Sequence, residues 1–225
     1  MLDDQHGVRF TLRSADGDEG YPGAVVAQAT YRVEGADTLV LEYEVSTDAP
    51  THVNLTNHAY WNLGGVGSGD ILDHVVEIYA DQYLEFDADN IPWGNILEVA
   101  GTPLDFRTPK VVGARINDLP KPNYDHCYVV RKTAGEGPAR VATVYDPGSG
   151  REMKVFSTQP GVQFYTAQGL SDRYSYQGKP YGPYHGLCLE TQHYPNTPNV
   201  PSFPTTLLRP GEVYKHTTVH RFGVK

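Results

Sequence analysis

The sequence is poor in several kinds of residue, and each scarcity excludes a class of protein. Only 18 lysines and arginines stand against 27 aspartates and glutamates, which gives a formal net charge of -9 at pH 7. Such a chain lacks the positive surface that binds nucleic acid or anionic membranes, so neither is expected as a partner. No run approaches the roughly 20 apolar residues of a membrane-spanning helix. No basic region followed by an apolar run marks a signal peptide.

Cysteine is scarce as well. Cys127 and Cys188 are the only two, and each lies within an apolar, strand-like run. Their spacing is not that of a metal site, so the sequence predicts no metal. Two isolated thiols of this kind are typical of a reducing compartment, and we therefore expect a cytoplasmic protein. A disulfide between them is the less favoured alternative.

Turn-forming and aromatic residues are abundant instead. The 225 residues include 23 glycines, 17 prolines and 16 tyrosines, while only 20% are charged, and this composition favours an all-β protein. We find neither a repeat nor a linker, so residues 1–225 are predicted to form one domain. Alternating apolar and polar residues predict strands, and Asp146–Gly150 predicts a hairpin turn. The strands expected from this pattern cover residues 8–13, 25–33, 38–46, 124–130, 141–145 and 152–157.

Two further segments have weaker patterns. Asp81–Asn95 is predicted to be a loop because its Asp, Asn, Pro and Gly residues interrupt any regular period, and His74 just before it is expected on the surface. Tyr174–Tyr184 is a tyrosine-rich loop with Gly and Pro. Such a loop suits the rim of a carbohydrate pocket or a protein interface, and the sequence does not decide between them.

The segment Thr51–Gly65 concentrates side chains that can contact a polar ligand. Its apolar residues Val53, Leu55 and Leu63 are separated by multiples of two, which predicts a strand with one face in the core. His58 is then expected on the other face, where an imidazole can exchange a proton near neutral pH. The alternative is a core histidine that bonds to the backbone.

A second segment, Gly186–Tyr194, places a carboxylate in an apolar strand. Leu187 and Leu189 alternate with Cys188 and Glu190, so Glu190 should face away from the leucines. Burial would raise the pKa of this carboxyl and suit it to general acid–base catalysis. A glutamate on a solvated sheet face is the alternative interpretation.

Both segments, and several others, resemble the aldose 1-epimerases, also called galactose mutarotases. The resemblance rests on matching blocks that follow the order of the family and run almost to the end of the chain. These blocks are residues 18–23, 54–65, 91–94, 124–126, 158–166, 188–192, 208–212 and 216–218. The resemblance implies an antiparallel β-sandwich of the galactose mutarotase type.

The resemblance also implies an isomerase that interconverts the α and β anomers of an aldohexose. It implies that Glu190 is the catalytic base and His58 the catalytic acid. It implies that the sugar is bound by Asp125, Gln163, Asn57 and Tyr60. His126 is interpreted as structural because its neighbour Asp125 occupies the family position. The implied scheme needs no cofactor and no metal.

Two other functions stay open. The chain could act on a non-sugar cyclic hemiacetal or a related ring-opening substrate, or it could bind carbohydrate without catalysis. Either reading is compatible with the same residues, and a measurement of anomer interconversion separates binding from catalysis.

The chain differs from the family in its N-terminal region. Family members have well over a hundred residues before the block at Asp18–Gly23, including an arginine and a histidine that line the sugar site, whereas 17 residues precede it here. We therefore expect an N-terminally shortened sandwich with an incomplete substrate site and weak activity. Its unpaired edge should be covered by a homodimer, by a partner chain, or by rebuilt structure.

Overall fold

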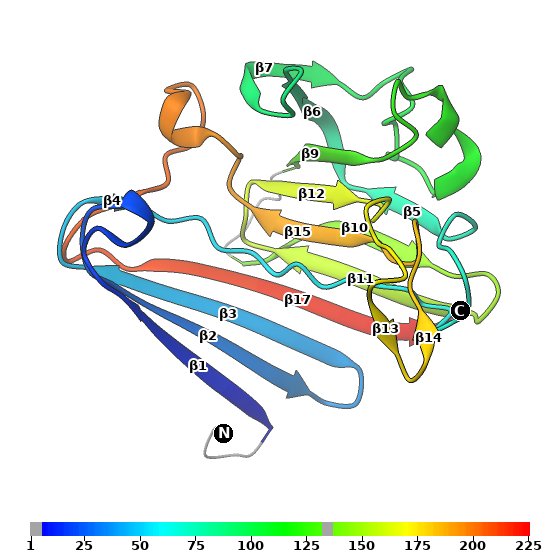
Figure 1. Ribbon diagram of the computed structural model, residues 1–225, viewed down its shortest axis with the longest axis horizontal. Coiled ribbons are helices and arrows are strands. Elements are labelled where there is room, and N and C mark those ends of the chain that lie inside the picture. The colour runs from blue at the N-terminus through cyan, green and yellow to red at the C-terminus, as the bar shows by residue number, and fades with distance from the viewer. Residues whose placement is uncertain (1–5, 132–136) are drawn as a thin grey trace.

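The structure is a computed structural model that describes residues 6–131 and 137–225, and antiparallel strands predominate in it (Figure 1). Eight of the strands form one large sheet. In sheet order they are β1 (Gly7–Ser14), β2 (Val25–Glu34), β3 (Thr38–Thr47), β17 (Tyr214–Val224), β11 (Arg151–Ser157), β10 (Ala139–Tyr145), β5 (Val75–Ile78) and β8 (Lys110–Val111). The predicted strands at the start of the chain and the hairpin at Asp146–Gly150 are thus confirmed.

A second sheet of five strands lies against part of the first (Figure 1). In order it contains β15 (Cys188–Gln192), β12 (Gly161–Tyr165), β9 (Asp125–Val130), β6 (Ala80–Phe86) and β7 (Pro92–Glu98). The remaining elements are the pairs β13 (Ser175–Tyr176) with β14 (Lys179–Pro180) and β16 (Leu207–Leu208) with β4 (Thr51–His52), and the 3₁₀ turns η1 (Asp18–Gly20), η2 (Val112–Ala114), η3 (Ile116–Asp118) and η4 (Thr197–Asn199). Within the described residues, no helix is long and apolar enough to cross a lipid bilayer.

The main core lies between the two sheets and orients the second one. Val144 and Met153 of the large sheet belong to the same buried cluster as Phe164 and Leu189 of the smaller sheet. Because successive side chains of a strand point to opposite faces, burial of Leu189 turns Glu190 to the outer face of the smaller sheet. The antiparallel all-β class predicted from composition and alternation is therefore confirmed.

The predicted strand over Thr51–Leu63 is mostly absent. Only Thr51–His52 forms regular β-structure, and residues 53–60 belong to no strand. Side chains replace the missing backbone pairing, because the Thr56 hydroxyl donates to the Thr191 carbonyl (3.0 Å). Trp61 then forms an isolated bridge with Leu187, through backbone hydrogen bonds of 2.8 and 2.9 Å. This segment therefore runs beside β15.

The loop predicted over Asp81–Asn95 is wrong, because β6 and β7 form a hairpin there. Asp87, Asp89 and Asn90 lie in its turn, whereas Pro92 and Gly94 lie within β7. The carboxylate of Asp87 accepts hydrogen bonds from the backbone N–H groups of Asp89 and Ile91, both at 2.9 Å. A side chain that bonds to the backbone two and four residues later builds a tight turn, so a short cluster of such residues need not indicate a long loop.

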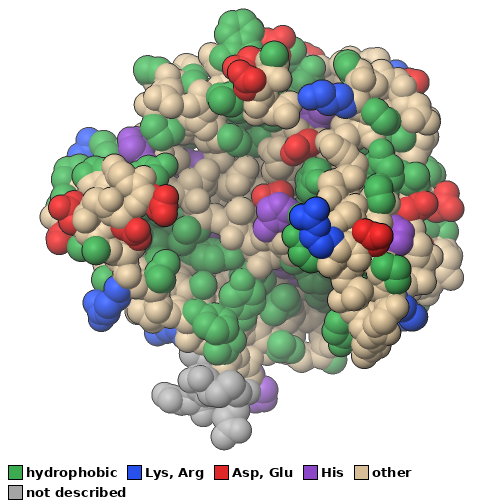
Figure 2. All heavy atoms as spheres, viewed as in Figure 1, with side chains coloured by type: hydrophobic (Ala, Val, Ile, Leu, Met, Phe, Trp, Pro, Cys, Tyr) green, Lys and Arg blue, Asp and Glu red, His purple; other side chains and the backbone are tan. Residues whose placement is uncertain are grey.

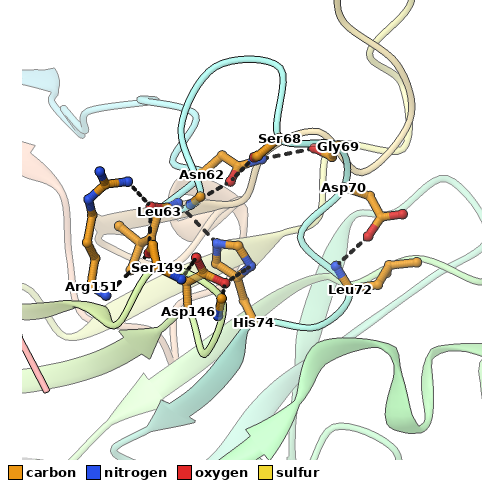
Figure 3. A network of polar contacts seen from close by, with 12 residues as sticks. Asn62, Leu63, Ser68, Gly69, Asp70, Leu72, His74, Asp146, Ser149 and Arg151 are labelled. Atoms are coloured by element: carbon orange, nitrogen blue, oxygen red, sulfur yellow. Dashed lines mark hydrogen bonds and ion pairs between the residues drawn. The ribbon is translucent and has the colours of Figure 1, made fainter.

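The expected surface position of His74 is also wrong, since only 3% of this residue is exposed. Its Nε2 accepts a hydrogen bond from the Leu63 N–H (3.0 Å), and its Nδ1 lies 3.9 Å from Asp146 (Figure 3). The Leu63 carbonyl accepts bonds from Ser149 and Arg151 in turn. The pKa of His74 is lowered by burial, which keeps the ring neutral and able to accept that bond. These contacts hold the end of the segment that carries His58.

The first strand of the large sheet is poorly covered. β1 is the terminal strand of this sheet, and its Phe10 and Leu12 are 59% and 66% exposed. In Figure 2, apolar side chains gather on the face where β1, β2 and β3 lie in Figure 1. An exposed strand edge with apolar residues is a surface that other chains can pair with.

Candidate active site

A cleft of about 520 Å³ opens on the outer face of the smaller sheet. A hollow with acidic and histidine side chains is visible on the face shown in Figure 2. The residues that line the cleft are His58, Tyr60, Phe86, Asn90, Asp125, Gln163, Tyr165, Glu190, Gln192 and Pro195. Its volume lies within the range of roughly 300–1,000 Å³ that is usual for small-molecule sites.

His58 and Glu190 meet in this cleft. His58 Nε2 lies 3.5 Å from Glu190 Oε1. Two groups that act on one pyranose ring must lie within about 10 Å of each other, and this pair satisfies that limit. The Glu190 side chain is 11% exposed and the His58 side chain 48%. Burial is the main cause that raises the pKa of Glu190, the negative charge of Asp125 raises it further, and His58 opposes both. The predicted raised pKa is therefore found, with the predicted cause.

Asp125 and Gln163 form a second pair in the cleft. Gln163 faces Glu190 across the β12–β15 ladder, and Asp125 begins the next strand, β9. The Gln163 amide donates a hydrogen bond of 2.7 Å to Asp125 Oδ1. Gln163 Oε1 is buried and has no hydrogen-bond partner among the described residues. A buried acceptor without a partner costs free energy, so this oxygen is suited to a donor that a ligand supplies.

The two remaining predicted binding residues have different positions. Tyr60 lines the cleft, and its ring stacks on that of His58 with centroids 4.9 Å apart. Asn57 is not among the residues that line the cleft, and its amide donates to the hydroxyl of Tyr31 (3.0 Å). His126, interpreted as structural, packs against Phe86, and burial lowers its pKa to about 4.

Sequence reasoning missed several cleft residues. Tyr165 and Gln192 each lie two positions after a predicted site residue, Gln163 and Glu190, on the same strand. Side chains two positions apart share a face of a strand, so alternation could have found both. Phe86 belongs to the segment that was assigned wrongly as a loop.

The tyrosine-rich loop lines a different cleft. Tyr174 and Tyr181 border a neighbouring hollow of about 550 Å³ together with Trp61 and His185. Tyr60 lines both hollows and so separates them. Neither Tyr174 nor Tyr181 is among the residues around His58 and Glu190.

These features define a class of protein: a β-sandwich in which a histidine and a buried glutamate are in contact within a cleft large enough for a small ligand. Comparison with known sequences then gives the family. The aldose 1-epimerase family matches residues 2–221. Galactose mutarotase from Rattus norvegicus is 43% identical over 220 residues, and aldose 1-epimerase from Escherichia coli K12 is 37% identical over 221. The alignments cover 97% and 96% of this chain, and 64% and 63% of those relatives.

Solved structures agree. An aldose epimerase homologue from C. elegans superposes with a TM-score of 0.89 at 30% identity, covering 97% of this chain and 66% of that one. Galactose 1-epimerase from Lactobacillus acidophilus superposes with a TM-score of 0.83 at 26% identity, with coverages of 99% and 65%. The chain belongs to the aldose 1-epimerase family, and it spans a little under two thirds of the length of the curated relatives it matches.

Proposed function

We propose that this chain is an isomerase that interconverts the α and β anomers of an aldohexose by opening and reclosing the sugar ring. The observation that carries the proposal is the His58–Glu190 contact of 3.5 Å in a cleft that also contains the Asp125–Gln163 pair. Ring opening needs one group that takes a proton and one that gives a proton, both within reach of the same small ring. Galactose is the substrate to test first, because the relatives are named for it.

Glu190 acts as the base. Its carboxylate removes the proton from the anomeric hydroxyl, the bond between the anomeric carbon and the ring oxygen breaks, and the open-chain aldehyde forms. A raised pKa brings the basicity of Glu190 closer to the working pH, which makes proton transfer more efficient than with an ordinary carboxylate.

His58 acts as the acid and protonates the ring oxygen as that bond breaks. Its side chain is half exposed and reaches the cleft, and it takes the proton back from the same oxygen when the ring recloses. Stacking on Tyr60 limits the rotation of the imidazole. Rotation about the bond next to the aldehyde, followed by reclosure with the proton transfers reversed, yields the other anomer.

Asp125 and Gln163 hold the sugar. A sugar hydroxyl can donate a hydrogen bond, and the pair offers two acceptors for such bonds. The unpartnered Gln163 Oε1 accepts from one hydroxyl, while the Asp125 carboxylate accepts from another. Tyr60 and Tyr165 supply aromatic surface beside them.

Polarimetry tests the proposal. Freshly dissolved α-galactose changes its optical rotation spontaneously, and the chain should accelerate that change in proportion to its concentration. Acceleration with galactose identifies a mutarotase. Binding of galactose in calorimetry without acceleration identifies a carbohydrate-binding protein, and an absence of both directs the search to non-sugar hemiacetals.

Three features of the whole chain belong to the same proposal. We place residues 1–225 in one domain, because the main buried cluster joins strands of both sheets. We place the protein in the cytoplasm, because Cys127 and Cys188 are both free and buried. We also propose that β1 pairs with a second copy of the chain through its exposed edge.

A further inference from the structure

Cys188 lies next to the acid–base pair but has no part in the proposed reaction. It is two residues before Glu190 on β15, so both side chains point to the same side of the strand. One nitrogen of His58, the sulfur of Cys188 and one oxygen of Glu190 all lie within 4.8 Å of one another. The spacing of cysteines in the sequence gave no sign of this cluster, because its third member comes from a distant segment.

One distance in this cluster already matches that of a tetrahedral zinc site. With metal–ligand bonds of about 2.0–2.3 Å, neighbouring ligand atoms around Zn²⁺ are separated by about 3.4–3.6 Å. The separation of His58 Nε2 from Glu190 Oε1 is already 3.5 Å. The Cys188 sulfur lies within 4.8 Å of one nitrogen of His58 and one oxygen of Glu190, so a small side-chain movement would complete the site. The half-exposed side chain of His58 is free to make part of that movement.

Charge and ligand type favour the same ion. A thiolate and a carboxylate together neutralise a divalent cation, so the complex is uncharged in a place where Cys188 is fully buried and Glu190 nearly so. Sulfur and imidazole ligands favour zinc over magnesium or calcium, which prefer oxygen. On binding, the thiol of Cys188 transfers its proton to the solvent and forms the metal–sulfur bond.

We propose that His58, Cys188 and Glu190 form a Zn²⁺ site, and that zinc in this site inhibits the enzyme by occupying the acid and the base. His58 and Glu190 line the cleft, so the ion enters there and the fourth coordination position is left to solvent. The inhibition rests on the proposed mutarotase activity, whereas the binding of zinc does not.

Metal binding is therefore measured first and without any assay of activity. Equilibrium dialysis of the full chain against ZnCl₂ should give one bound ion, and CoCl₂ should produce a near-ultraviolet thiolate-to-cobalt band. Cys188→Ser should abolish the band and weaken zinc binding by at least about 100-fold, since even the loss of an outer-shell partner costs about 10–100-fold. Cys127→Ser is the matched control, because that thiol is equally buried and outside the cluster.

Two results would overturn the site: a cobalt complex without the thiolate band, or equal zinc affinity in Cys188→Ser and the parent chain. If Cys188→Ser does not fold, as judged by its melting curve, His58→Gln replaces it, because that side chain is half exposed.

In polarimetry, zinc should slow the parent chain and Cys127→Ser but not Cys188→Ser. Zinc binding without inhibition would refute the inhibitory role, but the zinc site itself would stand. A parent chain that is inactive without zinc would refute only the proposed mutarotase function.

Discussion

His58 and Glu190 approach to 3.5 Å because the segment that carries His58 runs along the free edge of β15. The Trp61–Leu187 bridge and the hydrogen bond from Thr56 to Thr191 hold that segment on either side of His58. The proposed acid and base are thus positioned by edge contacts of the smaller sheet rather than by neighbouring strands of a continuous ladder.

Replacement of Glu190 by glutamine should remove most of the turnover and little of the binding. The amide keeps the size of the side chain but cannot take a proton, so kcat should fall by about 10²–10⁴-fold while galactose affinity in calorimetry changes little. Glu44→Gln is the control, because that exposed carboxylate only pairs with Lys215 on the surface. Turnover near that of the parent chain would remove the assignment of the base.

The pH dependence of activity should follow the raised pKa of Glu190. The base works only when it is deprotonated, so kcat/KM should fall as the pH drops through a value above the ordinary 4.5 of a glutamate. Because the pKa of Glu190 is raised, the folded state binds this proton more tightly than the unfolded state does. The free energy of unfolding should therefore fall as the pH rises from 4.5 through the pKa of Glu190 in the folded state. A profile of kcat/KM that stays flat to pH 4.5 would contradict this prediction.

Three histidines with lowered pKa values should make the protein sensitive to acid. Burial lowers the pKa values of His126, His216 and His220 to about 4 from 6.5. The unfolded chain therefore binds protons between pH 6.5 and 4 that the folded chain does not, and the free energy of unfolding should fall as the pH is lowered through this window. Urea titrations at several pH values measure it. His220→Phe should flatten the dependence, and an equally steep dependence in this variant would exclude His220 as a cause.

Loss of Asp125 should weaken sugar binding. Hydrogen bonds to charged groups contribute about 1.5–3 kcal/mol, so Asp125→Ala should lower kcat/KM by roughly 10–150-fold, mainly through a higher KM. The variant also leaves the Gln163 amide without its partner. Asp118→Ala, at an exposed ion pair with Arg115, is the control. A loss confined to kcat, with KM unchanged, would assign Asp125 to proton transfer instead.

Association through β1 should depend on its exposed apolar residues. Leu12 is 66% exposed on this terminal strand, so Leu12→Lys should shift sedimentation equilibrium toward the monomer. Val224→Lys changes a residue that is 83% exposed on β17, a strand that is not at the edge, and should leave the equilibrium unchanged. A parent chain that stays monomeric at high concentration would exclude the dimer.

Alternation predicted those parts of the structure in which each residue's neighbours are local. It correctly predicted β1, β2, β3 and the β10–β11 hairpin. It also predicted correctly that Glu190 and Leu189 face opposite sides of their strand. It failed where side chains took over the hydrogen bonds of the backbone, as at Thr56 and Asp87. It could not predict that Cys188 lies close to His58, because their proximity depends on pairing between segments far apart in the chain.

The place of β17 in the large sheet bears on how the protein is made. This strand follows every other strand of the sheet in the chain, yet it lies between β3 and β11 and pairs with both. During synthesis, β1, β2 and β3 can pair with one another early, but they cannot join the other half of the sheet until β17 has left the ribosome. Such long-range pairing folds slowly and leaves strand edges exposed in the meantime. In a nascent chain halted before Tyr214, the two halves of the large sheet should therefore stay unjoined, and a protease should cleave between them. Both members of the proposed acid–base pair, His58 and Glu190, have already been made at that point.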